Sequence, residues 1–210
     1  MPLLNSYLVN ENCIWGLWKI AESEEDLYYS LEENIDREEL TTLIHPKRRI
    51  EWLAARALAK VLIGQMSGNL PNEFFICKDE YGKPFIKNSD WQISFSHCSL
   101  YAVAILHKTQ AVGIDIEQVS PRISRVIRRI CTKEELAWAG DSLAKLTTLW
   151  CSKEALYKYY GKKKLDFRKE IMVSKNANKG RISTNEGIKE MALVNVSSLE
   201  NYQIVYCLAV

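Results

Sequence analysis

Residues 113–117, Gly-Ile-Asp-Ile-Glu, constrain the fold and chemistry of this chain more than any other stretch. Apolar and acidic residues alternate strictly here, which is typical of a strand with one apolar and one polar face. Asp115 and Glu117 therefore share a face, and two carboxylates so placed repel each other unless a cation lies between them. The pattern predicts a strand over residues 111–117 whose acidic face suits a cation.

A second motif, Trp-Cys-Ser-Lys-Glu-Ala-Leu-Tyr-Lys, occupies residues 150–158. Its spacing is helical, and Glu154 and Lys158 share a helix face because they are four residues apart. Carboxylate oxygens suit Mg²⁺, and a nearby lysine suits a phosphate. The two motifs together indicate a divalent-metal site for a phosphate-bearing substrate. Read alone, Glu154 and Lys158 better fit an exposed ion pair on the helix surface.

Length and composition set wide limits. The 210 residues are enough for one large domain or two small ones, and 47% hydrophobic with 26% charged residues is typical of a globular protein. The formal net charge of +2 indicates no general affinity for polyanions such as nucleic acids. We find no apolar run near 18 residues and no signal-peptide pattern, and the six cysteines are scattered. A cytoplasmic protein with reduced thiols is expected.

The periodicity of apolar residues, with the capping, glycine and proline residues that begin and end elements, predicts an α+β protein. A turn is expected at Tyr81–Pro84 and a polar bend at His97–Ser99, between two strands. The expected helices begin at Glu24, Asp36, Lys47 (to Ile63, ending near Gly64), Pro121 and after Thr132. A further helix carries Trp150 to Tyr160 and ends at Gly161. The expected strands are 14–20, 74–78, 92–96, 101–106, 111–117, 171–174, 181–184, 188–194 and 202–209.

Two pairs of segments within the chain are similar in sequence. Trp52–Lys60 aligns with Trp150–Lys158, 98 residues later, and Trp15–Ile20 aligns with Val112–Glu117, 97 residues later. The shared register predicts two copies of one α+β unit, over residues 1–108 and 109–210, although chance similarity of Ala/Leu-rich helices is the alternative. The acidic residues occur in one copy only, because Asp115, Glu117 and Glu154 correspond to Trp18, Ile20 and Arg56.

These motifs together resemble those of the Sfp-type 4′-phosphopantetheinyl transferases, in the holo-acyl-carrier-protein synthase superfamily. Two further segments match in order: Tyr81–Pro84 is similar to the Gly-Lys-Pro turn of the family, and Phe95–Cys98 to its Ser-His-Ser segment, with Cys98 in place of the usual serine. The resemblance covers about residues 45–175 and is weaker beyond them.

The resemblance implies a pseudo-twofold α+β fold of two similar halves with the active site in the cleft between them. It implies an enzyme that transfers 4′-phosphopantetheine from coenzyme A to a serine of an apo acyl- or peptidyl-carrier protein and releases adenosine 3′,5′-bisphosphate. It further implies dependence on Mg²⁺. The duplication suggests a monomer, because a site formed between the halves needs no second chain, and the composition indicates no nucleic-acid or membrane partner.

The family also implies roles for particular residues. Mg²⁺ would be held by Asp115, Glu117 and Glu154, so Asp115 would contact coenzyme A through the metal, and Lys158 would reach the leaving phosphate. The serine proton would pass to Glu117, Glu135 or a metal-bound water. The residues expected to contact the rest of coenzyme A are Ser96, His97, Arg49 and Arg56 at the 3′-phosphate, and Lys83 and Pro84 near the adenine.

Each of these assignments has a simpler alternative. Glu135 equally fits a capping box with Thr132; His97 would also fit an ordinary turn, and Arg49 and Arg56 a solvated helix face. Residues Lys162–Lys164 fit either a solvated loop or a contact with an acidic carrier protein, and Lys163 replaces a glycine that is common in the family. For the whole chain, the alternatives are a non-catalytic carrier-protein or nucleotide-binding module and a metal-dependent nuclease or phosphohydrolase.

Overall fold

The computed structural model describes residues 2–31, 37–68, 75–162, 164–196 and 199–210. It divides into two compact units, residues 1–110 and 111–210, so the division falls two residues after the boundary expected from the sequence. The expected site in a cleft between the halves stays a prediction.

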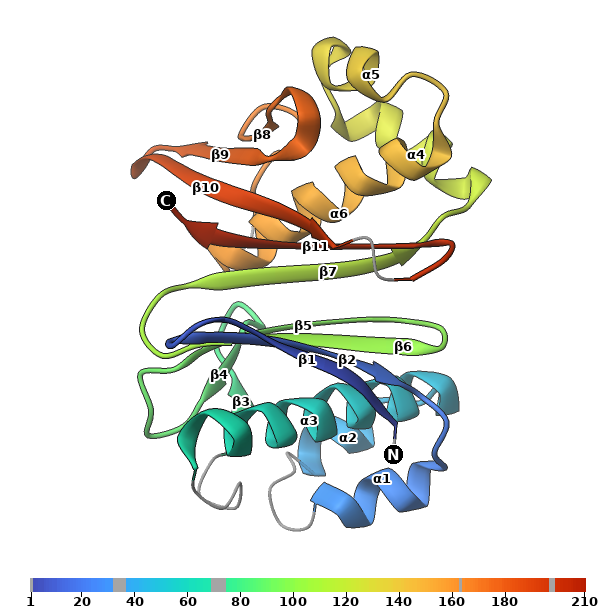
Figure 1. Cartoon of the computed structure of the whole chain (residues 1–210), viewed down its shortest axis with the longest axis vertical. Coiled ribbons are helices and arrows are strands. Elements are labelled where there is room, and N and C mark those ends of the chain that lie inside the picture. Colours follow the sequence, from blue (N-terminus) through green and yellow to red (C-terminus); the bar gives the residue numbers. More distant parts are fainter. Residues whose placement is uncertain (1, 32–36, 69–74, 163, 197–198) are drawn as a thin grey trace. The chain divides into compact units, whose positions relative to one another are not determined.

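The first unit is an antiparallel sheet with a long helix lying along one face (Figure 1). Its strands are in the order β1-β2-β6-β5-β4-β3, and helix α3 packs against β2, β5 and β6. The elements are β1 Leu3–Asn10, β2 Cys13–Lys19, α1 Glu24–Leu31, α2 Arg37–Thr42, α3 Pro46–Ser67, β3 Ile76–Lys78, β4 Pro84–Ile86, β5 Gln92–Cys98 and β6 Tyr101–His107.

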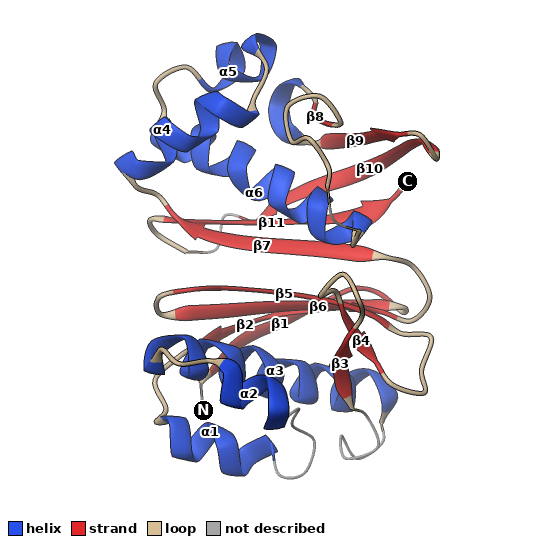
Figure 2. Ribbon diagram, turned by 180° about the vertical axis from the view of Figure 1, so that it is seen from behind, coloured by secondary structure: helices blue, strands red, loops and turns tan. Residues whose placement is uncertain are grey.

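The second unit is built in the same way. Its antiparallel strands are in the order β7-β11-β10-β9-β8, and helix α6 lies on β7 and β11 (Figure 2). The elements are β7 Val112–Gln118, α4 Pro121–Ile130, α5 Lys133–Ala139, α6 Leu143–Tyr160, β8 Ile171–Val173, the short 3-10 helix Lys175–Ala177, β9 Lys179–Thr184, β10 Gly187–Val196 and β11 Tyr202–Ala209.

The two units share one topology. In the described residues of each, a strand is followed by three α-helices, the third of them the longest, and then by four strands, the last of which pairs with the first. Strand β1 is an addition at the edge of the first sheet. This common order confirms the predicted α+β fold and supports the duplication over chance similarity. Within the described residues, no helix combines the length and apolarity needed to cross a bilayer.

A glycine in the first strand of each repeat lies beneath the long helix. A Cβ atom added at Gly113 would lie 1.9 Å from the backbone oxygen of Ala155 on α6. A Cβ atom added at Gly16 on β2 would instead meet the side-chain methyl carbons of Leu62 and Leu58 on α3, at 2.9 and 3.0 Å. The motif glycine therefore lets α6 approach β7 down to backbone contact.

Several boundaries differ from the expected ones. Helix α3 continues past Gly64 to Ser67 and is capped by Gly68, whose φ of 66° suits a glycine C-cap. Strand β5 includes His97 and Cys98, and the bend falls at Ser99, with a φ of 47°, and Leu100. Strand β1 gave no alternating signal because most of its side chains are exposed. The predicted helix start at Asp36 lies outside the described residues.

We expect Gly113→Ala to abolish folding of the second unit or to lower the free energy of unfolding by about 3 kcal/mol or more, because the added carbon meets backbone that cannot move aside. Gly16→Ala is the matched control, and it should cost about 1 to 2 kcal/mol because leucine side chains can rotate away. Urea unfolding of both variants measures the difference. Equal losses would contradict the proposed close approach of α6 to β7.

Candidate functional site

The acidic face of β7 is directed at helix α6. Gly113, Asp115 and Glu117 alternate along the strand, so they share the face on which α6 lies. The Lys158 ammonium donates to Oδ1 of Asp115 at 2.7 Å and to the carbonyl oxygen of Ile114 at 3.1 Å. Asp115 is only 5% exposed. Lys158 therefore pairs with the strand carboxylate Asp115. The metal and phosphate roles of these residues stay a prediction.

Glu154 lies near both strand carboxylates. Burial, followed by the negative charge of Asp115, raises the pKa of Glu154 to about 7; Glu117 adds to this, and Lys158 opposes it. Cys151, one turn earlier on α6, is buried, and the same two strand carboxylates help burial to raise the pKa of its thiol far above the usual value. The thiol of Cys151 therefore stays protonated beside Asp115 and Glu117.

The donor chemistry of this cluster fits a hard divalent cation. Three carboxylates whose charges disfavour one another are stabilised by a cation, and carboxylate oxygen is the ligand that Mg²⁺ prefers. In the part of the chain that the structure describes, no group of three or more His, Cys, Asp or Glu side chains is already arranged as a metal cage. The cation that contacts Asp115 in this arrangement is the ammonium of Lys158.

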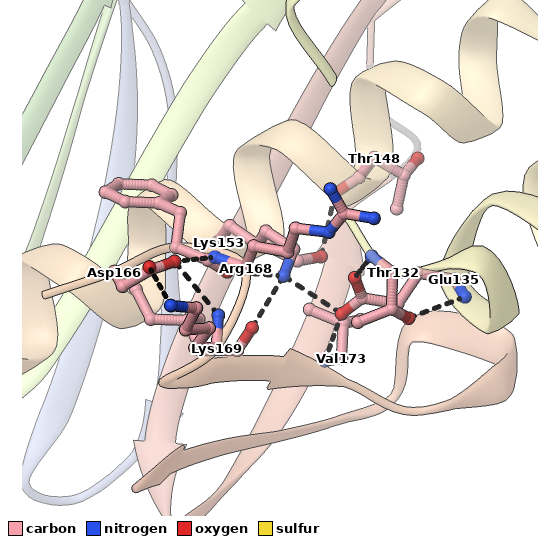
Figure 3. Close-up of polar contacts among 11 residues, drawn as sticks. Thr132, Glu135, Thr148, Lys153, Asp166, Arg168, Lys169 and Val173 are labelled. Carbon is pink, nitrogen blue, oxygen red and sulfur yellow. Dashed lines mark hydrogen bonds and ion pairs between the residues drawn. The ribbon is translucent and has the colours of Figure 1, made fainter. Parts of the chain in front are cut away.

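Another side of α6 carries a second charged residue, Lys153, which is fully buried. Lys153 has no exposed surface, and its ammonium lies 3.0 Å from Oε1 of Glu135 (Figure 3). It also donates to the carbonyl oxygens of Phe167 at 2.8 Å and Ile171 at 2.5 Å. The three donors of the ammonium thus have three acceptors. The contacts fix the rotation of α6 about its axis, and with it the direction in which Glu154 points.

Glu135 is engaged at both carboxylate oxygens. Besides binding Lys153, its Oε1 accepts the backbone N–H of Val173 at 2.8 Å, and its Oε2 accepts that of Thr132 at 2.8 Å. The Thr132 hydroxyl accepts the N–H of Glu135 in return, which confirms the capping box (Figure 3). The expectation that Glu135 accepts the serine proton is untested, but its contacts are those of a structural residue.

In the first unit, the two arginines expected at the 3′-phosphate form ion pairs with nearby helices. Arg49 contacts Glu24 at 2.7 Å and donates to the carbonyl oxygen of Leu40 at 2.9 Å. Arg56 is 4% exposed, pairs with Glu39 at 3.0 Å and stacks on the ring of Trp52 at 3.3 Å. These contacts join α3 to α1 and α2 and leave a phosphate-binding role for either arginine unsupported.

His97 and Ser96 lie on opposite faces of their sheet because both belong to β5. His97 faces α3, where its Nδ1 lies 3.2 Å from Oε2 of Glu51. The Lys47 ammonium lies 3.3 Å from the Ser99 hydroxyl, at the same end of β5. The structure therefore gathers Lys47, Glu51 and His97 at one place and separates Ser96 from them. The sequence motifs assigned no binding role to Lys47 or Glu51, although the two residues lie one helical turn apart on α3.

The remaining predicted residues lie in turns. The Tyr81–Pro84 turn is confirmed: Asp79 accepts the N–H of Lys83 at 2.8 Å, Gly82 has a φ of 85°, and Pro84 then begins β4. In the lysine-rich loop, Lys162 pairs with Glu186 at 2.5 Å on the surface, Lys164 is exposed, and Lys163 lies outside the described residues.

Both units of the chain match known protein families. The 4′-phosphopantetheinyl transferase superfamily matches residues 111–207, and the 4′-phosphopantetheinyl transferase N-terminal domain matches residues 36–107. The chain is also similar to 4′-phosphopantetheinyl transferase Sfp of Bacillus subtilis (strain 168), with 25% identity over 161 residues. That alignment covers 71% of this chain and 70% of the relative.

The pKa of Glu154 leads to a prediction for stability. Because its pKa is raised, Glu154 stays protonated in the folded protein at pH values where it ionises in the unfolded chain. The contribution of this carboxyl to folding stability is therefore fully present at pH 4 and is lost as the pH rises through about 7. In the presence of a chelator, wild-type protein should therefore lose more stability than Glu154→Gln between pH 5 and 8, by at most about 3 kcal/mol.

Urea unfolding at both pH values measures this difference, with the exposed Glu190→Gln as control. Mg²⁺ added at pH 8 should restore stability to the wild type and much less to Glu154→Gln. Parallel pH profiles for the two proteins would contradict the crowding of carboxylates around Glu154.

Proposed function

Because this chain belongs to the 4′-phosphopantetheinyl transferase superfamily, we propose that Asp115, Glu117, Glu154 and Lys158 perform the transfer of 4′-phosphopantetheine from coenzyme A to a carrier protein. The transfer itself is the activity of the family. The observation that carries the assignment is the acidic face of β7 held against α6, with the Lys158 ammonium on Asp115 and a pKa of about 7 at Glu154.

The reaction joins the serine oxygen of an apo acyl- or peptidyl-carrier protein to the β-phosphorus of coenzyme A. The bond from that phosphorus to the bridging oxygen breaks, and adenosine 3′,5′-bisphosphate leaves with the electron pair. Asp115, Glu117 and Glu154 would hold Mg²⁺, which when bound supplies positive charge to the diphosphate oxygens.

The protein's own groups complete the chemistry. Lys158, already placed beside Asp115, would donate to the departing phosphate and stabilise its added charge. Glu117 is half-buried on the same strand face and would accept the serine proton. We assign Glu135 to structure, since Lys153, Val173 and Thr132 engage its carboxylate.

Coenzyme A binding involves the first unit. We assign the 3′-phosphate to His97 and Lys47, since Arg49 and Arg56 form ion pairs with Glu24 and Glu39. Lys83 and Pro84 are retained near the adenine, in an ordered turn that exposes part of each side chain.

The direct test is transfer to a carrier. The protein is incubated with coenzyme A, Mg²⁺ and an apo carrier protein, and the carrier is weighed by mass spectrometry. Asp115→Ala and Glu154→Ala should each lower turnover by at least about 100-fold while remaining folded, because phosphoryl transfer loses metal-based stabilisation. The exposed Glu190→Ala should keep wild-type turnover.

Chelation should likewise stop transfer, and added Mg²⁺ should restore it. Near-normal turnover by folded Asp115→Ala would refute the assignment. An unmodified carrier alongside hydrolysed coenzyme A would favour a phosphohydrolase, and an unmodified carrier with intact coenzyme A would favour a non-catalytic module.

For the carrier protein, we propose docking on helix α4. This helix begins three residues after β7 ends, and its buried side carries Ile123 and Ile127. Val126 on the exposed side keeps 43% of its surface accessible, amid a row of basic side chains. Exposed arginines around a single accessible valine suit an acidic partner. The exposed arginines of α4 are Arg122, Arg125, Arg128 and Arg129.

Replacing Arg122, Arg125 and Arg129 together by glutamine should raise the KM for the carrier about tenfold and flatten the salt dependence of kcat/KM. The KM for coenzyme A should stay unchanged. The comparison variant replaces Lys162, Lys163 and Lys164 by alanine, and we expect a smaller effect because Lys162 already pairs with Glu186. A larger effect of the lysine variant would place docking on that loop, as the sequence first suggested.

A further inference from the structure

Glu51 is a buried carboxylate with an exposed partner. It is 8% exposed on α3, between residues of the apolar core, whereas the side chain of His97 is 37% exposed at the end of β5. A buried carboxylate without a partner is costly, so the contact of 3.2 Å between Oε2 of Glu51 and Nδ1 of His97 stabilises this carboxylate. The same contact determines how the imidazole is oriented.

The direction of the contact has a chemical consequence. An Nδ1–H that donates to a carboxylate directs the opposite nitrogen, Nε2, away from Glu51. A carboxylate behind an imidazole also fixes the rotation of the ring, as it does for histidines that bind metals. His97 would thus present one defined edge to a ligand.

The surroundings favour an anion at that edge. Lys47 lies one helical turn before Glu51 on α3, and its ammonium contacts Ser99 in the turn that follows β5. When His97 is protonated, Lys47 and His97 carry two positive charges against the single negative charge of Glu51. A phosphate dianion is the class of ligand that suits this pair of cations, and its binding would itself favour the protonated ring.

We propose that Glu51 is a positioning residue that orients His97 toward the 3′-phosphate of coenzyme A. The inference rests on the proposed function, in which His97 contacts that phosphate. Glu51 itself does not touch the substrate in this scheme. It acts through the ring, so removing its charge should harm recognition of the 3′-phosphate and leave the transfer step intact.

The experiment compares coenzyme A with 3′-dephospho-coenzyme A in the transfer assay, using wild type, Glu51→Gln, His97→Ala and the double variant. Glu51→Gln should raise the KM for coenzyme A about tenfold. It should change kcat and the KM for the dephospho substrate less than twofold. The double variant should resemble His97→Ala alone, because both changes remove one coupled effect. The exposed Glu38→Gln on α2 is the matched control.

A second readout does not depend on turnover. The ¹⁵N shifts of the His97 ring in wild-type protein should show Nδ1 protonated before and after addition of adenosine 3′,5′-bisphosphate, and Glu51→Gln should shift them. A ring in which Nδ1 carries no proton would overturn the proposal even if the variant failed to fold. So would unchanged shifts and an unchanged KM ratio in folded Glu51→Gln.

The phosphate contact of His97 and the positioning role of Glu51 can be tested separately. If His97→Ala affects both substrates equally, the phosphate assignment of His97 is wrong, and the proposal for Glu51 falls with it. If His97→Ala discriminates between the substrates but Glu51→Gln does not, the phosphate assignment holds and only the positioning role is refuted.

Discussion

The contact between Gly113 and the backbone of Ala155 is the constraint on which the second unit depends. Without a side chain on the strand, helix α6 comes down to backbone contact. At that distance a residue one position before Ala155 and another three after it both reach the acidic face of the strand. Lys158 thus contacts Asp115, and Glu154 lies near it, because a side chain is missing at Gly113. A helix held farther from the strand would separate these groups.

The two repeats show how one framework carries different chemistry. Trp18 lies in the apolar core beneath α3, at the position that Asp115 occupies beneath α6. Arg56 of the first repeat stacks on Trp52 and pairs with an acid from a neighbouring helix, where the second repeat has Glu154. In the first unit, the residues at the equivalent positions, Trp18 and Arg56, therefore stabilise the fold. In the second unit, Asp115, Glu117 and Glu154 lie near one another instead, and burial together with the two strand carboxylates raises the pKa of Glu154.

Local patterns predicted most of this structure, and distant pairings accounted for the failures. The helix caps at Thr132 and Gly161 and the acidic strand follow from neighbouring residues, so the sequence revealed them. The partner of Arg49 lies 25 residues away on another helix, and no local rule pairs them. His97 and Ser96 were separated because the strand ran longer than its polar residues suggested. The motif contained Lys153, but only the packing of three elements around α6 revealed that it is buried.

Because Lys153 is buried, its chemical reactivity reports on the separation of α6 from its neighbours. An amine-reactive label needs an accessible, uncharged nitrogen, and this ammonium has no exposed surface and three acceptors in place. Labelling at this position therefore counts molecules in which α6 has come away from β8 and α5. The surface lysines of the same chain react in the closed state and provide an internal reference for the time that each molecule spends open.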